Sequence, residues 1–195
     1  GLSAYRAIAA GAARHLAPKG AESACIMGAG MQAFLQLQAL TLVRPIRRAT
    51  IWARDIAKAT GLAVRASSEL GIAAKAVADP AQAVADAEIV VTTTPATTPI
   101  LKAEWLQPGQ HVTAMGSDQP GKNEIEPACL ARAHRYVPDR QSQTEVLGEL
   151  RAAIAAGPVA AGTRFPELRA RICGTAPGRP TPPALTLAAP PGTRP

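Results

Sequence analysis

The chain has 195 residues, a formal net charge of +7 and 47% hydrophobic residues, yet only 3% of its residues are aromatic. This length is enough for one full domain with additions, or for two small domains. No apolar run reaches the roughly 18 to 20 residues that a membrane-spanning helix needs, and no signal peptide is visible, so we expect a soluble, cytoplasmic protein without a membrane partner.

The three cysteines and the positive charge exclude several classes of function. Cys25, Cys129 and Cys173 are odd in number, far apart and without metal-ligand spacing, so we expect neither a metal site nor a disulfide framework. The Lys and Arg residues are scattered and are not interleaved with aromatic residues, which favours a solvated, arginine-rich surface. Nucleic-acid binding stays a weaker alternative and predicts binding that weakens steeply with salt.

Strand and helix patterns alternate along the chain. Apolar positions at helical spacing predict a helix over residues 2–17, which Pro18-Lys-Gly20 ends. The predicted elements that follow are strand 24–27, helix 32–42, strand 49–52, helix 55–68, strand 73–77, a helix from Asp79-Pro80, strands 89–93 and 111–115, helix 127–131, strand 136–137 and helix 143–156. This alternation predicts an α/β fold of the Rossmann type: a doubly wound, mainly parallel sheet with helices on both faces.

Residues 174–195 differ from the rest of the chain, since they hold seven of its 18 prolines. Proline lacks the backbone donor and fixes φ, so we expect little regular structure here, except at residues 185–187. We interpret the segment as a disordered or loosely docked tail.

A glycine-rich turn follows the first predicted strand. Residues 24–33 combine a short apolar run, the pattern Gly28-x-Gly30-x-x-Ala33 and the start of a helix, which is the order of the phosphate-binding turn in dinucleotide folds. Gly28 permits a tight turn, Gly30 permits close approach of a pyrophosphate, and the helix N-terminus favours negative charge. The residues assigned to the cofactor are Gly28, Ala29, Gly30, Met31 and Gln32. A purely structural turn is the alternative.

The end of the second predicted strand bears on the choice of cofactor. An acid there binds the adenosine ribose of NAD, whereas a basic residue accommodates the extra phosphate of NADP. Arg54 stands about where the acid would be, and Asp55 follows it. A guanidinium binds phosphate well, so we favour NADP(H) slightly over NAD(H). In the alternative, Arg54 points to solvent and Asp55 merely caps the next helix.

Two further loops follow strand ends, where open α/β sheets bind ligands. The hydroxyl groups of Thr93 and Thr94, before Pro95, could contact the cofactor, or they could simply end a β-branched strand. The loop 116–124 begins with Gly116 and carries Asp118, a carboxylate well placed to move a proton or hold an amine. A turn-forming aspartate is the alternative.

Several motifs together resemble the ornithine cyclodeaminase/mu-crystallin family. They are Ile-Met-Gly-Ala-Gly-Met-Gln-Ala (26–33), Met-Gly-Ser-Asp-Gln-Pro-Gly-Lys-Asn-Glu (115–124), and residues 90–99, 105–111 and 176–179. The resemblance covers residues 2 to about 187. Within the family the chain is most similar to the cyclodeaminase-like protein of ectoine-utilisation operons, on residues 111–118, 122–124, 147–150 and 153–157.

The resemblance implies a cofactor, a chemistry and two further site residues. Members bind NAD(H) or NADP(H) and act on amino acids through imines. In a cyclodeaminase the cofactor takes hydride from the α-carbon, the δ-amine attacks, ammonia leaves and hydride returns. The catalytic aspartate of the family falls on Asp118, and Arg6 matches an arginine that binds the substrate carboxylate.

The departures from the family pattern are also informative. Members are about half as long again and begin with a substrate and dimerisation domain, so we interpret the chain as truncated at its N-terminus. We assign residues 1–20 to a helix leading in from that domain, 21–173 to the NAD(P)-binding domain and 174–195 to the tail. We expect dinucleotide binding with little turnover, and an interface for the family homodimer that is mostly missing. A non-catalytic dinucleotide-binding module is the alternative.

Overall fold

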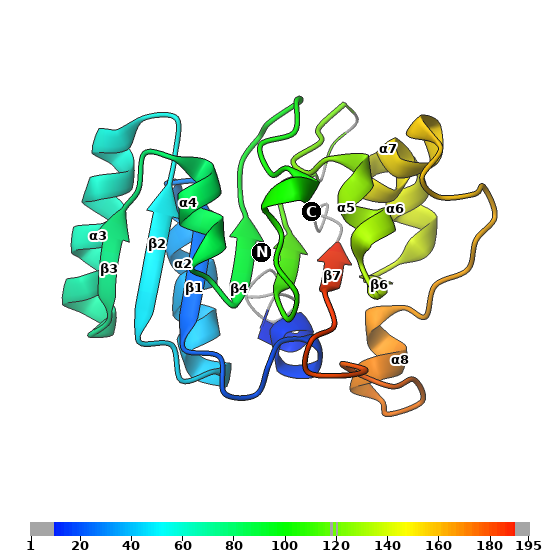
Figure 1. Ribbon diagram of the computed structural model, residues 1–195, viewed down its shortest axis with the longest axis horizontal. Coiled ribbons are helices and arrows are strands. Elements are labelled where there is room, and N and C mark those ends of the chain that lie inside the picture. The colour runs from blue at the N-terminus through cyan, green and yellow to red at the C-terminus, as the bar shows by residue number, and fades with distance from the viewer. Residues whose placement is uncertain (1–9, 118, 120, 190–195) are drawn as a thin grey trace.

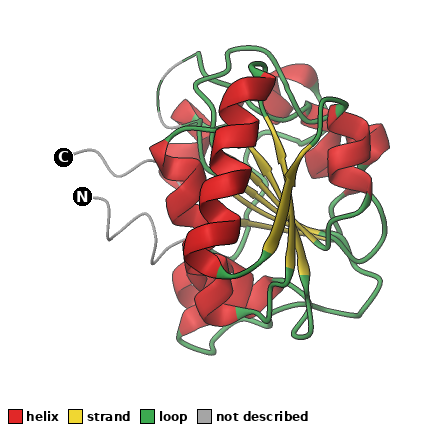
Figure 2. Cartoon of the chain, turned by 90° about the vertical axis from the view of Figure 1, so that its left-hand side faces the viewer, coloured by secondary structure: helices red, strands yellow, loops and turns green. Residues whose placement is uncertain are grey.

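The fold is a single parallel sheet with helices on both faces (Figures 1 and 2). The computed structural model describes residues 10–117, 119 and 121–189. The strands are β1 (Ser23–Met27), β2 (Arg48–Trp52), β3 (Ala73–Ala76), β4 (Ile89–Thr92), β5 (His111–Ala114), β6 (Arg135–Pro138) and β7 (Thr186–Ala189). Their order across the sheet is β3-β2-β1-β4-β5-β7-β6. The predicted doubly wound α/β fold is confirmed.

Short and long helices cover the sheet. They are α2 (Met31–Val43), α3 (Ile56–Leu70), α4 (Pro80–Ala85), α5 (Pro127–Arg132), α6 (Gln141–Leu147), α7 (Glu149–Ala156) and α8 (Leu168–Ile172), with a 3-10 turn, η1, at Ala103–Trp105. Residues 10–16 are also helical and residue 17 is a bend; residues 2–9 of the predicted first helix lie outside the described residues. Within the described residues, no helix is long and apolar enough to cross a membrane.

The centre of the sheet is buried on both faces. Every residue of β1 and β4 is buried, as expected for strands covered by helices on either side. β1 pairs with both neighbours in one register, so that Met27 lies opposite Trp52 of β2 and Thr92 of β4. The loops after these three strands therefore begin side by side at one edge of the sheet.

The helix predicted over 143–156 is in fact two helices. α6 ends at Leu147 and α7 begins at Glu149, because Gly148 between them is extended (φ −110°, ψ −162°). The break directs Glu149 into the protein, where only 1% of its surface is exposed. The short helix α8 and the turn η1 were not predicted at all.

Although regular structure was expected only at residues 185–187 of the predicted tail, residues 186–189 are firmly docked. These residues form β7, which lies between β5 and β6 and is buried along its whole length. Arg179 fixes the approach to the strand, because its guanidinium donates to several backbone carbonyl oxygens. These belong to Leu16 (3.0 Å), Gly109 (2.6 Å), Pro182 (2.7 Å) and Ala184 (2.6 Å).

The positive charge is also less solvated than expected. Arg44 is buried and donates to the last carbonyl oxygens of the helical segment 10–16 and to those just after it. The acceptors are Ala13 (2.9 Å), Arg14 (2.8 Å), Ala17 (3.1 Å) and Pro18 (2.8 Å). Arg44 therefore works as a structural cap, which corrects the expectation of a surface residue.

Leu187→Ala distinguishes a structural strand from a loosely docked tail. The side chain is fully buried between the neighbouring strands and helices, so its truncation should lower the free energy of unfolding by about 2–5 kcal/mol. Urea unfolding followed by circular dichroism measures this change. Val64→Ala on the exposed face of α3 is the control; an equal, small effect of both substitutions would contradict the role of β7.

Candidate functional site

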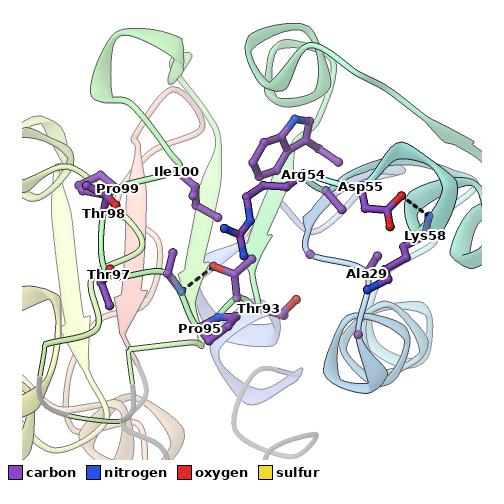
Figure 3. A pocket seen from close by; sticks show the side chains of 16 residues that line it. Ala29, Arg54, Asp55, Lys58, Thr93, Pro95, Thr97, Thr98, Pro99 and Ile100 are labelled. Atoms are coloured by element: carbon purple, nitrogen blue, oxygen red, sulfur yellow. Dashed lines mark hydrogen bonds between the residues drawn. The ribbon is translucent and has the colours of Figure 1, made fainter.

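The loops after β1, β2 and β4 enclose a cavity of about 710 Å³ (Figure 3). Its lining comes from the glycine turn, the end of β2 with the start of α3, and the loop after β4. The lining residues are 28–30, 52–55, 58 and 93–100. Because these segments follow strands aligned in one register, the parallel sheet itself brings them together.

The glycine turn fits tightly against the loop after β4. Gly28 has φ +131°, and a Cβ there would lie 2.4 Å from Thr93 Oγ1, so no larger residue fits. The Gly28 amide donates to the carbonyl oxygen of Trp52 (2.7 Å), which closes the turn over β2. Gly30 precedes α2 and has no side chain over its N-terminus. The amides of the first turn of α2 can therefore serve an anion, as a bound pyrophosphate requires.

Arg54 and Asp55 have different roles. Asp55 Oδ1 accepts hydrogen bonds from the amides of Ala57 (3.0 Å) and Lys58 (3.4 Å), so the carboxylate caps α3, as one of the two interpretations predicted. The Arg54 side chain points into the cavity (Figure 3). Lys58 also lines the cavity and extends toward Ala29, although it was not among the predicted site residues.

A second, smaller cavity of about 200 Å³ adjoins the first. Its lining includes Gln32 of α2, Gly116 and Met115 after β5, and Lys122. Residues 93–95 line both cavities, so the loop after β4 is their common wall. Gln32, Thr93, Thr94, Pro95 and Gly116 therefore come together around the smaller cavity. Gly28, Ala29 and Gly30 lie around the larger cavity, whereas Met31 is exposed.

Two buried glutamates lie beneath the smaller cavity, and neither was identified from the sequence. The Glu124 carboxylate accepts hydrogen bonds from the loops after β4 and β5. Burial raises its pKa, although the hydrogen bonds from Thr92, Thr94 and Gly116 lower it. Glu149 accepts hydrogen bonds from the Ser117 hydroxyl and from the Glu124 amide (3.0 Å). It therefore ties the beginning of the loop 115–124 to its end.

One histidine and two cysteines are buried away from both cavities. His111 is fully buried and bonded to the hydroxyls of Thr186 (2.9 Å) and Thr113 (3.0 Å), and burial lowers its pKa to about 3. Burial also raises the thiol pKa of Cys25 and of Cys129 to about 12. No cluster of three metal-ligating side chains occurs among the described residues. Asp118 and Arg6 lie outside the described residues.

Strand order, glycine turn and cavity together define a class of protein. A parallel sheet in the order 3-2-1-4-5, with a glycine turn after β1 at the carboxyl edge, is the dinucleotide-binding Rossmann fold. The sequence signature of the ornithine cyclodeaminase/mu-crystallin family matches residues 1–190. The chain belongs to that family.

Individual relatives agree with this assignment. The chain is 54% identical to an uncharacterized cyclodeaminase of Sinorhizobium fredii, over 96% of its own length and 57% of that protein's. It superposes with a TM-score of 0.93 and 26% identity on Delta(1)-pyrroline-2-carboxylate reductase of Thermococcus litoralis in complex with NADH and L-proline, covering 98% of this chain and 59% of that one. For iminosuccinate reductase of Paracoccus denitrificans in complex with NAD+, the TM-score is 0.88 and the identity 31%, with 97% and 57% covered. The chain thus spans less than two thirds of these relatives.

Glu149→Gln should alter how stability depends on pH. Burial raises the pKa of Glu149 from 4.5 to about 7, so between these values the folded chain holds a proton that the unfolded chain releases. The stability of the parent chain should therefore fall as pH rises through this window, and level off above it. Glutamine does not titrate, so the variant should not lose stability in this way as pH rises.

The measurement is the melting temperature of both proteins at pH 5 and pH 8. We expect the glutamine variant to gain relative to the parent chain on going to pH 8. Glu69→Gln, on the exposed part of α3, controls for the loss of one negative charge. The same difference between variant and parent at both pH values would contradict a buried, titrating Glu149.

Proposed function

We propose that this chain is the NAD(P)-binding part of an oxidoreductase that acts on amino acids or cyclic imines, of the cyclodeaminase or imine-reductase type. The observation that carries the proposal is the wall shared by the two cavities, residues 93–95. A dinucleotide with its pyrophosphate on the glycine turn would pass this wall and reach the loop that contains Asp118. The cofactor and the proposed catalytic residue would therefore meet at one edge of the sheet.

The names of the relatives favour the same chemistry. Matching proteins include Delta(1)-pyrroline-2-carboxylate reductase, iminosuccinate reductase and alanine dehydrogenase. The products or substrates that these names give all have nitrogen bonded to carbon next to a carboxylate. We therefore propose a substrate of that kind, either a free amino acid or a product of ectoine breakdown.

Each proposed site residue of the chain would have its own role in binding or in the reaction. The amides at the start of α2 hold the pyrophosphate, and the absence of a side chain at Gly28 lets the turn close. The bound nicotinamide supplies hydride transfer to or from the substrate carbon. Asp118 moves the proton or holds the amine, and Arg6 binds the carboxylate. The relatives extend well beyond the aligned region, where we place most other substrate contacts and the homodimer interface.

The cofactor would be NADP(H) or NAD(H), and we favour NADP(H) slightly. Because Asp55 is engaged in capping α3, Arg54 and Lys58 are the charged side chains that would face the adenosine ribose. A guanidinium can bind the extra phosphate with paired hydrogen bonds. The complexes of the two solved relatives contain NADH or NAD+, so the proposed preference for NADP(H) rests on Arg54 and Lys58.

Arg54→Ala tests the cofactor and its phosphate together. Titration of the parent chain with NADPH or NADH, followed by Trp52 fluorescence, should saturate, since Trp52 lines the cavity. Arg54→Ala should weaken NADPH about tenfold, the loss of a charge-assisted hydrogen bond, and leave NADH within twofold. Arg47→Ala, at the other end of β2, is the control. An equal change for both dinucleotides would remove Arg54 from phosphate recognition, and no saturable binding would contradict the function.

Asp118→Asn tests the catalytic assignment. In a protein that joins this chain to the remaining family region, reduction of Δ1-pyrroline-2-carboxylate should slow by about a hundredfold or more, the usual contribution of a general acid. NADPH binding should stay within twofold, because the glycine turn is untouched. Full activity of the asparagine variant would exclude Asp118 from the reaction.

A further inference from the structure

We propose that Glu124 is a positioning residue, which joins the loops after β4 and β5 and so shapes the smaller cavity for the nicotinamide end of the cofactor. This inference rests on the proposed function, because that function places the nicotinamide there. Glu124 does not line the cavity itself. It would act through residues that do, Thr94 and Gly116.

All the hydrogen-bonding capacity of the Glu124 carboxylate is directed at the two loops. The side chain is fully buried. Oε1 accepts from the Thr94 amide (2.5 Å) and the Thr94 hydroxyl (2.9 Å). Oε2 accepts from the Thr92 hydroxyl (2.6 Å) and from the Gly116 amide (2.5 Å). One carboxylate thus links the end of β4 to the start of the loop after β5.

The backbone of Glu124 holds the far end of the loop after β4. Its carbonyl oxygen accepts from the amides of Ile100 (2.8 Å) and Leu101 (3.1 Å). The loop 93–100 is therefore fixed to Glu124 at both ends. The side chain of Glu124 holds its start, and the backbone of Glu124 holds its end. The side chain of Glu124 thus holds Thr94 and Gly116, which line the smaller cavity, whereas Arg54, Asp55 and Lys58 on the far side of the larger cavity come from other segments.

The contact between the two loops leaves no room for adjustment. A Cβ on Gly116 would lie 2.0 Å from the Thr94 carbonyl oxygen and 2.5 Å from Glu124 Cδ. Any movement of the glutamate would consequently displace the walls of the cavity directly. Glu149 supports this arrangement from behind, because it accepts from the Glu124 amide and from Ser117.

The geometry at this position favours a side chain with two acceptor oxygens. Two backbone amides, which can only donate, approach different oxygens of Glu124. Glutamine has the same size but offers one acceptor and one donor, so its amide nitrogen would face one of the two N–H groups. Glu124→Gln should therefore push Thr94 and Gly116 apart without opening a void.

The experiment compares a whole dinucleotide with its adenosine half. For the parent chain and Glu124→Gln, the dissociation constants of NADPH and of 2′,5′-ADP are measured by Trp52 fluorescence. If NADH binds more tightly to the parent chain, NADH and ADP replace them. We expect the variant to bind the whole dinucleotide at least fivefold more weakly, with loss of the nicotinamide fluorescence change, and the adenosine half within twofold.

Glu126→Gln is the matched control, since Glu126 is a nearby carboxylate that bonds a backbone amide, that of Ala103 (2.9 Å), away from either cavity. This control should bind both ligands as the parent chain does. If Glu124→Gln fails to fold, Thr92→Val removes one of the four donors, and should give a smaller form of the same selective loss, about twofold to threefold.

The outcomes separate this inference from the function on which it rests. A parent chain that binds no dinucleotide removes both, and this is seen before any variant is made. If the parent chain binds and Glu124→Gln weakens both ligands equally, or weakens neither, only the positioning role is overturned. Weaker binding of the whole dinucleotide with unchanged binding of its adenosine half supports the positioning role, because a general loss of stability would weaken the binding of both ligands.

Discussion

The alignment of β1, β2, β4 and β5 at one edge of the sheet is the constraint on which the rest of the structure depends. Met27, Trp52 and Thr92 lie in one row across the register, and Thr92 lies opposite Ala114 of β5. Because parallel strands all end at the same edge, loops from distant parts of the chain must meet there. Both cavities and the two buried glutamates follow from this single arrangement.

Such an arrangement requires a complete sheet, and the last described segment of the chain completes it. β7 lies between β5 and β6. The segment that leads into it is held by Arg179, which donates to the carbonyl oxygens of Leu16, Gly109 and Ala184. The buried Arg44 and the partly buried Arg179 both organise loop backbones through their guanidinium groups. Desolvation lowers the pKa of Arg44 and of Arg179, and many carbonyl acceptors offset this cost.

Local signals predicted most of the fold, whereas features that depend on distant contacts were missed. The β-branched run at 89–92 and the glycine spacing at 28–30 each specify a conformation through their own sterics, and both were predicted correctly. Regular structure was expected at residues 185–187, but the docking of β7 between β5 and β6 was not, because its burial comes from those strands and not from its own proline-rich surroundings. Glu124 and Glu149 are 25 residues apart, and only the packing of α7 beneath the loops brings them together.

The charge around the adenosine end of the larger cavity follows from helix capping. Asp55 follows Arg54 directly, and its Oδ1 accepts hydrogen bonds from the amides of Ala57 and Lys58. An aspartate engaged in this way is less available to the hydroxyls of a ribose, while Arg54 and Lys58 still face the cavity. Two cationic side chains beside one engaged carboxylate favour a ligand with an additional phosphate. The requirement to cap α3 thus fixes Asp55, while its neighbour Arg54 faces the cavity, and this difference is the basis of the proposed preference for NADP(H).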